Sequence, residues 1–172
     1  MQVIDERCVD VPGGGILYDA AQLRKADESL FSVDAWAAKG AVERIAGGRG
    51  SIVLLNHEDR RWVLRHYRRG GLIAKIAADR YIWLGAARTR SFQEWRLLAR
   101  LYNLNLPVPR PIAARYVRHG LAYSADLMTE WIPNTRTVAE LLIARELDET
   151  LLRGVGQTIA RFHAAGVHHV DL

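Results

Sequence analysis

The last four residues, His169-Val170-Asp171-Leu172, follow the H-x-D-L pattern of loops in which an aspartate positions a hydroxyl for attack on a phosphate. In such a loop Asp171 would orient the hydroxyl and accept its proton. A pattern of four residues often arises by chance, so its weight depends on what precedes it. The other parts required are a cation that binds phosphate, an acid that holds this cation, and a turn that covers the phosphates.

Arg65 is the candidate cation, and it lies in a strand-like segment of apolar and basic residues. Alternation along a strand places Val63 and Tyr67 on the same face as Arg65, with Leu64 and His66 on the opposite face. An arginine between residues of buried type requires an anionic partner. Phosphate is one such partner, since a guanidinium can bind it through two parallel hydrogen bonds. The second is a helix glutamate.

Glu94 is the candidate glutamate, in a helix expected over residues 91–103. Ser91 and Glu94 have the spacing of a capping box, so Glu94 is open to a purely structural interpretation. However, Glu94, Leu98 and Leu101 fall on one face at i, i+4 and i+7, which directs the carboxylate along the apolar stripe of the helix. This placement would allow it to pair with the strand arginine.

A glycine-rich turn is expected between strand-like residues 42–45 and 52–55. It contains Gly48, Arg49, Gly50 and Ser51. A glycine turn between strands lets backbone N–H groups approach phosphate oxygens without a Cβ in the way. It differs from a dinucleotide-binding loop, which would lead into a helix. An ordinary glycine-rich hairpin remains the alternative interpretation.

Two further strands are expected over residues 112–118 and 121–132. An extended segment that leaves the sheet near Glu130 and Ile132 would expose backbone donors and acceptors for an adenine ring. The alternative is an ordinary edge strand that ends at Pro133.

Helices are expected on both sides of these strands. A short helix is predicted within residues 27–39, and residues 1–40 otherwise show no chemistry. After the last strand, Thr137 and Glu140 form a second capping box, and a longer helix is predicted over 148–165 with a stop at Gly166.

Composition points to a globular protein inside the cell. The chain has 172 residues, of which 49% are hydrophobic and 25% charged. It has no apolar run long enough for a transmembrane helix and no secretory signal at its N-terminus. The single cysteine, Cys8, excludes an internal disulfide framework and fits a reducing cytoplasm.

The net charge of +5 conceals a basic block at residues 60–115, which holds thirteen Lys or Arg and two acids. The rest of the chain is mildly acidic. Such a block suits an anionic partner, either a phosphorylated molecule, a lipid surface or a nucleic acid, although no nucleic-acid motif is present. A solvated basic face is the alternative.

The histidines near the C-terminus do not predict a metal site. His163, His168, His169 and Asp171 have no cysteine among them, and adjacent histidines in a strand point to opposite faces. We expect His163 and His169 to orient the catalytic loop instead.

The order of these parts resembles the eukaryotic-like kinase fold, and more closely the 3-deoxy-D-manno-octulosonic acid (Kdo) kinase family of lipopolysaccharide biosynthesis. The resemblance spans nearly the whole chain, and the run RHYRRGGL at 65–72 is its most distinctive part. It also rests on the glycine turn, on Thr89-Arg90-Ser91 with Glu94, on Val108-Pro109-Arg110-Pro111, and on His163 with the H-x-D-L segment. An arginine at position 65 is usual in that family.

The resemblance implies an α+β fold of the protein-kinase type. After a lead-in at 1–40, residues 41–132 would form an N-terminal antiparallel β-sheet lobe with a helix C. Residues 133–172 would begin an α-helical C-terminal lobe. The implied activity is ATP-dependent phosphorylation of the 4-hydroxyl of Kdo on a lipid A precursor, at the cytoplasmic face of the inner membrane, with no nucleic acid as partner.

The resemblance also implies a role for each candidate residue. Asp171 would act on the sugar hydroxyl, Arg65 would hold ATP phosphates, and Glu94 would orient Arg65. Gly48, Arg49, Gly50 and Ser51 would cover the phosphates, and Glu130 and Ile132 would contact adenine through their backbone.

A kinase also requires an asparagine about five residues after the catalytic aspartate and a later metal-binding aspartate. Because the chain stops one residue after Asp171, both Mg²⁺ ligands would lie beyond residue 172, and we expect this truncated form to be inactive. Two alternatives remain: a heptose kinase or another small-molecule kinase of the same fold, and a non-catalytic basic module that binds anionic lipid or nucleic acid.

Overall fold

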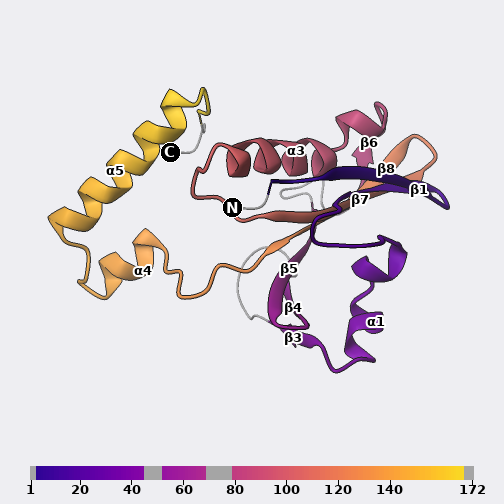
Figure 1. Cartoon of the computed structure of the whole chain (residues 1–172), viewed down its shortest axis with the longest axis horizontal. Helices are drawn as coiled ribbons and strands as arrows, with labels where there is room; N and C mark the ends of the chain where they lie inside the picture. The colour runs from indigo at the N-terminus through magenta and orange to yellow at the C-terminus, as the bar shows by residue number, and fades with distance from the viewer. Residues whose placement is uncertain (1–2, 45–51, 69–78, 169–172) are drawn as a thin grey trace.

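The structure is a computed structural model that describes residues 3–44, 52–68 and 79–168. Within them lies one eight-stranded antiparallel sheet in the order β1-β2-β7-β8-β5-β4-β3, with β6 paired to β8 (Figure 1). The strands are β1 (Glu6–Val11), β2 (Gly14–Asp19), β3 (Val42–Arg44), β4 (Ile52–His57), β5 (Arg60–His66), β6 (Tyr81–Ile82), β7 (Pro111–His119) and β8 (Ala122–Glu130). The expected α+β class with an antiparallel β-sheet lobe is confirmed.

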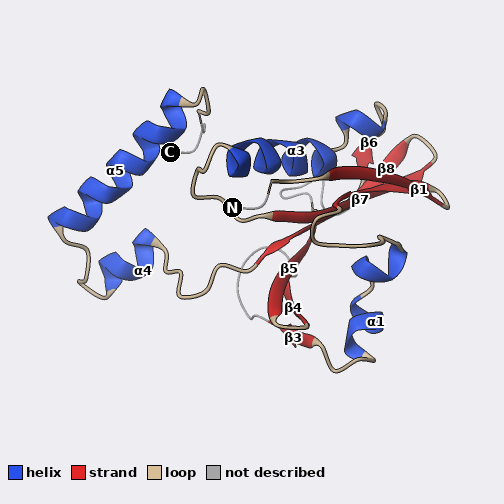
Figure 2. Cartoon of the chain, viewed as in Figure 1, coloured by secondary structure: helices blue, strands red, loops and turns tan. Residues whose placement is uncertain are grey.

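Helices cover both faces of the sheet. The short 3₁₀ helix η1 (Glu28–Phe31) and α1 (Val33–Ala37) pack on one face, while α3 (Arg90–Asn103), which follows the 3₁₀ turn η2 (Ala86–Arg88), packs on the other (Figure 2). Helices α4 (Val138–Ile143) and α5 (Glu149–Ala164) extend away from the sheet. None of the helices in the described ranges is long and apolar enough to cross a membrane.

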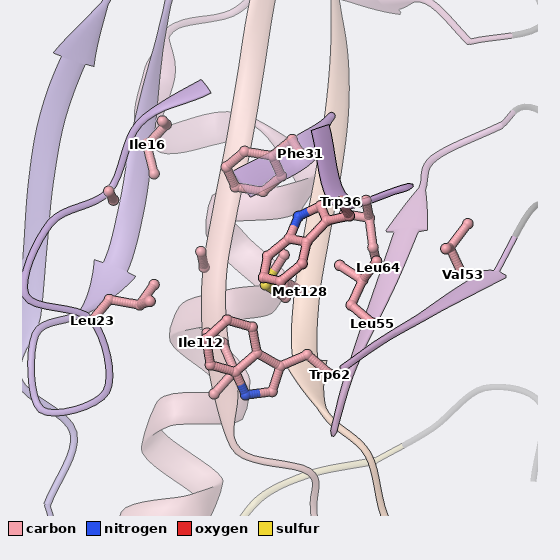
Figure 3. Close-up of a cluster of buried hydrophobic side chains, with 12 residues drawn as sticks. Ile16, Leu23, Phe31, Trp36, Val53, Leu55, Trp62, Leu64, Ile112 and Met128 are labelled. Carbon is pink, nitrogen blue, oxygen red and sulfur yellow. The ribbon is translucent and has the colours of Figure 1, made fainter. Parts of the chain in front are cut away.

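Strand alternation creates two apolar layers, one on each face. On the α1 face, Trp62 and Leu64 of β5 pack with Phe31 and Trp36 (Figure 3), and the rings of Trp36 and Trp62 meet edge-on with centroids 6.1 Å apart. On the α3 face, the core is formed by Leu17, Phe92, Trp95, Ala99, Ala114 and Leu127. Burial of α3 on this face fixes the orientation of any polar side chain on its inner stripe.

The expectation of a lead-in without strands at residues 1–40 is wrong, because β1 and β2 form a hairpin that extends the sheet along β7. Gly13 closes the hairpin with φ of 72°, a conformation that favours glycine. A Cβ on Gly14 would lie 2.1 Å from the carbonyl oxygen of Tyr116, so β2 approaches β7 more closely here than a side chain allows. Strand β1 is largely exposed and contains many polar residues, so its sequence lacks the alternation of apolar and polar residues that would predict a strand.

Helix α3 begins at Arg90 with Thr89 as its N-cap, so the alternative interpretation of Glu94 as a capping residue is wrong. Ser91 is buried, and its hydroxyl donates a hydrogen bond to the carbonyl oxygen of Arg115. Glu94 lies in the second turn, beyond the reach of the N-cap. The second predicted capping box is confirmed, since Thr137 and Glu140 exchange both hydrogen bonds at the start of α4.

Candidate active site

Arg65 and Glu94 form an ion pair between the centre of the sheet and α3. The Arg65 Nη2 atom lies 2.5 Å from Glu94 Oε1, and the two side chains are 40% and 38% exposed. Both are therefore anchored on rigid elements yet accessible to a ligand. The pairing expected from the alternation of β5 and the apolar stripe of α3 is confirmed.

Tyr67 completes this pair as a third member. Its hydroxyl donates to Glu94 Oε2 at 2.5 Å and accepts a hydrogen bond from Arg65 Nη2 at 3.1 Å. The Arg65 guanidinium also lies 4.8 Å from the centre of the Tyr67 ring. Sequence reasoning placed Tyr67 on the correct face but gave it no role, because an aromatic residue beside a strand cation is usually core.

The electrostatics of the triad fix its protonation states. Burial acts to lower the pKa of Arg65, but the charges and hydrogen bonds of Glu94 and Tyr67 together outweigh it, and the pKa is raised. Burial, followed by the hydrogen bond to Glu94, raises the pKa of Tyr67 well above its usual value. At neutral pH Arg65 is therefore a cation and Tyr67 remains a hydrogen-bond donor.

An apolar pocket of about 220 Å³ lies next to the ion pair on the α3 face. Its lining residues come from β4, β5, β8 and their neighbours: Ile52, Val63, Arg65, Glu94, Leu98, Pro109, Leu127 and Thr129. Val63 pairs with Thr129 and Arg65 pairs with Leu127 where β5 lies beside β8. The apolar residues of the pocket are therefore direct neighbours of its charged residue Arg65 on the same face of the sheet. A flat apolar group would fit against the apolar lining of the pocket, and an anion attached to that group would reach Arg65.

Glu130 is the last residue of β8 and directly follows the pocket residue Thr129, and Ile132 lies two residues beyond the strand. Because β8 lies between β7 and β5, the alternative of an ordinary edge strand is wrong. The Glu130 N–H donates to the carbonyl oxygen of Arg110 at 2.8 Å, and Ile132 is 43% exposed. Neither residue lines the pocket itself, although Glu130 is the chain neighbour of its lining residue Thr129.

The remaining site residues lie outside the described residues: Gly48, Arg49, Gly50, Ser51 and Asp171. The chain enters β4 at Ile52, which pairs directly with Arg65. Of the four residues weighed as metal ligands, His163 and His168 are described, and their rings stack with centroids 4.8 Å apart. Among described residues, no three His, Cys, Asp or Glu side chains lie close enough to hold a metal ion.

The basic block is partly neutralised by distant acids. Four of its arginines pair with carboxylates from other segments: Arg61 with Glu43, Arg96 with Glu6, Arg110 with Asp19, and Arg115 with Asp126. The charge asymmetry of the sequence therefore reflects in part the contacts between segments in the folded sheet.

The family model that matches the chain is the lipopolysaccharide kinase (Kdo/WaaP) family, over residues 33–172. A protein named 3-deoxy-D-manno-octulosonic acid kinase from Xanthomonas axonopodis pv. citri is 46% identical over 164 residues, 92% of this chain and 63% of that protein. A protein of the same name from Vibrio parahaemolyticus is 41% identical over 157 residues, 91% of this chain and 66% of that protein.

The chain spans about 63% of the length of the Xanthomonas axonopodis pv. citri relative. No solved structure matches it significantly. The matched region contains the Arg65–Glu94 pair, the apolar pocket and the end of β8. The chain belongs to the lipopolysaccharide kinase (Kdo/WaaP) family.

Proposed function

We propose that this chain carries the nucleotide site of an ATP-dependent kinase that phosphorylates the 4-hydroxyl of Kdo on a lipid A precursor. The observation that carries the proposal is the Arg65–Glu94 ion pair at the charged end of an apolar pocket. Family membership and the name of the relatives support the choice of Kdo as the acceptor. An anionic glycolipid acceptor would bring the protein to the inner face of the inner membrane.

In this proposal the adenine ring occupies the apolar pocket against the paired residues Val63 and Thr129, with backbone contacts from Glu130 and Ile132. The phosphates then reach Arg65, whose guanidinium is held in place by Glu94 and Tyr67. A preorganised cation of this kind stabilises the charge that develops on the transferred phosphoryl group.

The glycine turn at 48–51 covers the phosphates, and Asp171 accepts the proton of the attacking hydroxyl. A kinase uses ATP together with a divalent metal ion, which neutralises phosphate charge. Among the described residues, no three His, Cys, Asp or Glu side chains lie close enough to hold such an ion.

The test is phosphate transfer from Mg-ATP to a Kdo-bearing lipid A precursor by the full-length protein. Transfer that is abolished in Asp171→Asn, with the product phosphate at the 4-hydroxyl by NMR, would support the proposal. A folded protein that transfers no phosphate would overturn it. Salt-sensitive lipid binding without transfer would instead favour the basic binding module.

A further inference from the structure

A second pocket, of about 360 Å³, adjoins the ion pair on the side away from Thr129. It is lined by Ile52, Arg65, His66, Tyr67, Arg68, Tyr81, Arg90 and Glu94. Three arginines face one carboxylate, and this carboxylate already pairs with Arg65. We call this site the arginine pocket. Its two other cations, Arg68 and Arg90, give it an excess of positive charge.

Arg90 is fixed at the mouth of the pocket by its neighbours. Its backbone N–H donates to the hydroxyl of Tyr123 at 3.0 Å, and its guanidinium lies 5.2 Å from the centre of the Tyr81 ring. It is also the first residue of α3, whose first turn carries no acidic side chain. A cation at the positive end of a helix dipole is unfavourable unless an anion is bound nearby.

Arg68 follows the end of β5, three residues after Arg65, and is exposed. Neither Arg68 nor Arg90 forms a salt bridge with any residue in the described ranges. By contrast, Arg110 and Arg115, which lie in the same basic block, each pair with a carboxylate. Of the three arginines that line this pocket, only Arg65 therefore has a carboxylate partner among the described residues.

We propose that the arginine pocket binds a second anionic group, a phosphate or carboxylate, in addition to the phosphate held by Arg65. The guanidinium groups of Arg68 and Arg90 line the pocket beside Arg65, and bidentate hydrogen bonds from arginine suit both anions. The anion comes either from the glycolipid acceptor or from the terminal phosphate of the nucleotide. This assignment of the source rests on the proposed function, whereas anion binding itself does not.

The first arm of the test needs no catalysis. Pyrophosphate is titrated into the full-length protein by calorimetry, and the variants Arg68→Met and Arg90→Met are compared with Arg100→Met. Arg100 lies in the same helix and carries the same charge but does not line the pocket. We expect each pocket variant to weaken binding roughly tenfold and Arg100→Met to have little effect. Absent binding, or equal binding by all variants, would overturn the inference.

The second arm identifies the source of the anion through steady-state kinetics. A raised KM for the glycolipid in Arg68→Met and Arg90→Met, with the KM for ATP unchanged, assigns the pocket to the acceptor. The reverse result assigns it to the nucleotide. If no phosphate is transferred but the variants still lose pyrophosphate binding, the proposed function fails and the anion site stands.

Discussion

At the scale of single residues, the hydroxyl of Tyr67 connects the two charged groups of the candidate site. It donates to Glu94 and accepts from Arg65, so both carboxylate oxygens of Glu94 are engaged from the sheet. A guanidinium held at two points loses little further freedom when it binds phosphate. Tyr67 thus acts as a positioning residue for Arg65.

Tyr67→Phe should therefore lower kcat/KM for phosphate transfer about tenfold, since a hydrogen bond to a charged group contributes roughly 1.5 kcal/mol. The unfolding free energy in urea should fall by no more than about 1.5 kcal/mol, because the ring remains. Tyr116→Phe is the control, as it removes a hydroxyl that does not touch Glu94. Equal kinetics for wild type and Tyr67→Phe would show that the hydroxyl does not position Arg65.

His66, whose side chain alternates with those of Arg65 and Tyr67 along the chain, forms a pH-dependent contact with Asp126. Its Nδ1 lies 2.7 Å from Asp126 Oδ1 and its Nε2 lies 3.6 Å from Asp79, while Arg115 shares the Asp126 carboxylate. The hydrogen bond to Asp126 raises the pKa of His66, although burial opposes it. The stabilisation is therefore complete below about pH 6.5, the unfolded pKa, and is lost as pH rises through the higher folded pKa.

This predicts that the free energy of unfolding falls between pH 6 and pH 8.5 by more in wild type than in His66→Gln. Urea denaturation of both proteins at the two pH values measures the difference. The same pH dependence in both would remove His66 as its origin.

The Arg65–Glu94 contact could be predicted from two independent patterns. The alternation of the strand places Arg65 on one face of the sheet, and the apolar stripe of the helix directs Glu94 toward the same interface. The sequence did not predict the apolar pocket, because Val63, Leu127 and Thr129 come together only through the pairing of β5 with β8. The register between strands far apart in the chain is not readable from a single sequence.

At the scale of elements, the boundaries of α3, β7 and β8 agree with the prediction to within two residues. These boundaries could be predicted because α3 has a strong amphipathic periodicity and because prolines interrupt the chain between the elements. The β1–β2 hairpin escaped prediction because its strand β1 is exposed and polar, and because its stability comes from pairing with β7.

A buried ion pair between Asp19 and Arg110 links the β1–β2 hairpin to the segment before β7. Asp19, at the end of β2, receives two hydrogen bonds from Arg110 at 2.6 and 2.8 Å, and both side chains are almost fully buried. Asp19 Oδ1 also accepts hydrogen bonds from the N–H groups of Asp5 and Ala21. The arrangement anchors the N-terminal hairpin just before β7.

Arg110→Met should cost about 3–5 kcal/mol of unfolding free energy, because it leaves the Asp19 carboxylate buried without its cation. Arg7→Met breaks an exposed ion pair with Asp5 and should leave the unfolding free energy almost unchanged. Urea unfolding of the two variants distinguishes a structural pair from a surface one. A loss below about 1 kcal/mol in Arg110→Met would contradict this role.

At the scale of the whole molecule, the sheet lobe and the last two helices differ in burial. No residue of α4 or α5 is buried, and Leu142, Ile143 and Leu152 are 64%, 83% and 51% exposed. The sequence predicted both helices correctly from their caps and periodicity. It could not reveal that their apolar faces are exposed, since periodicity does not specify what covers a face.

Hydrogen exchange of the 172-residue chain should therefore show rapid exchange in α5 and strong protection in α3, whose inner face is buried. Mass spectrometry of peptides from both helices measures the contrast. Equal protection would show that α5 is stabilised by contacts beyond those of the described residues.

In the proposed function, Arg65 and Glu94 act as one unit on the phosphates of ATP. The most direct test is a double-mutant cycle on phosphate transfer by the full-length protein, with Arg65→Met, Glu94→Gln and both together. We predict a loss of about 10²–10³-fold for Arg65→Met and no further loss in the double variant. Activity close to wild type in Arg65→Met, or independent and additive losses in the double variant, would contradict the account.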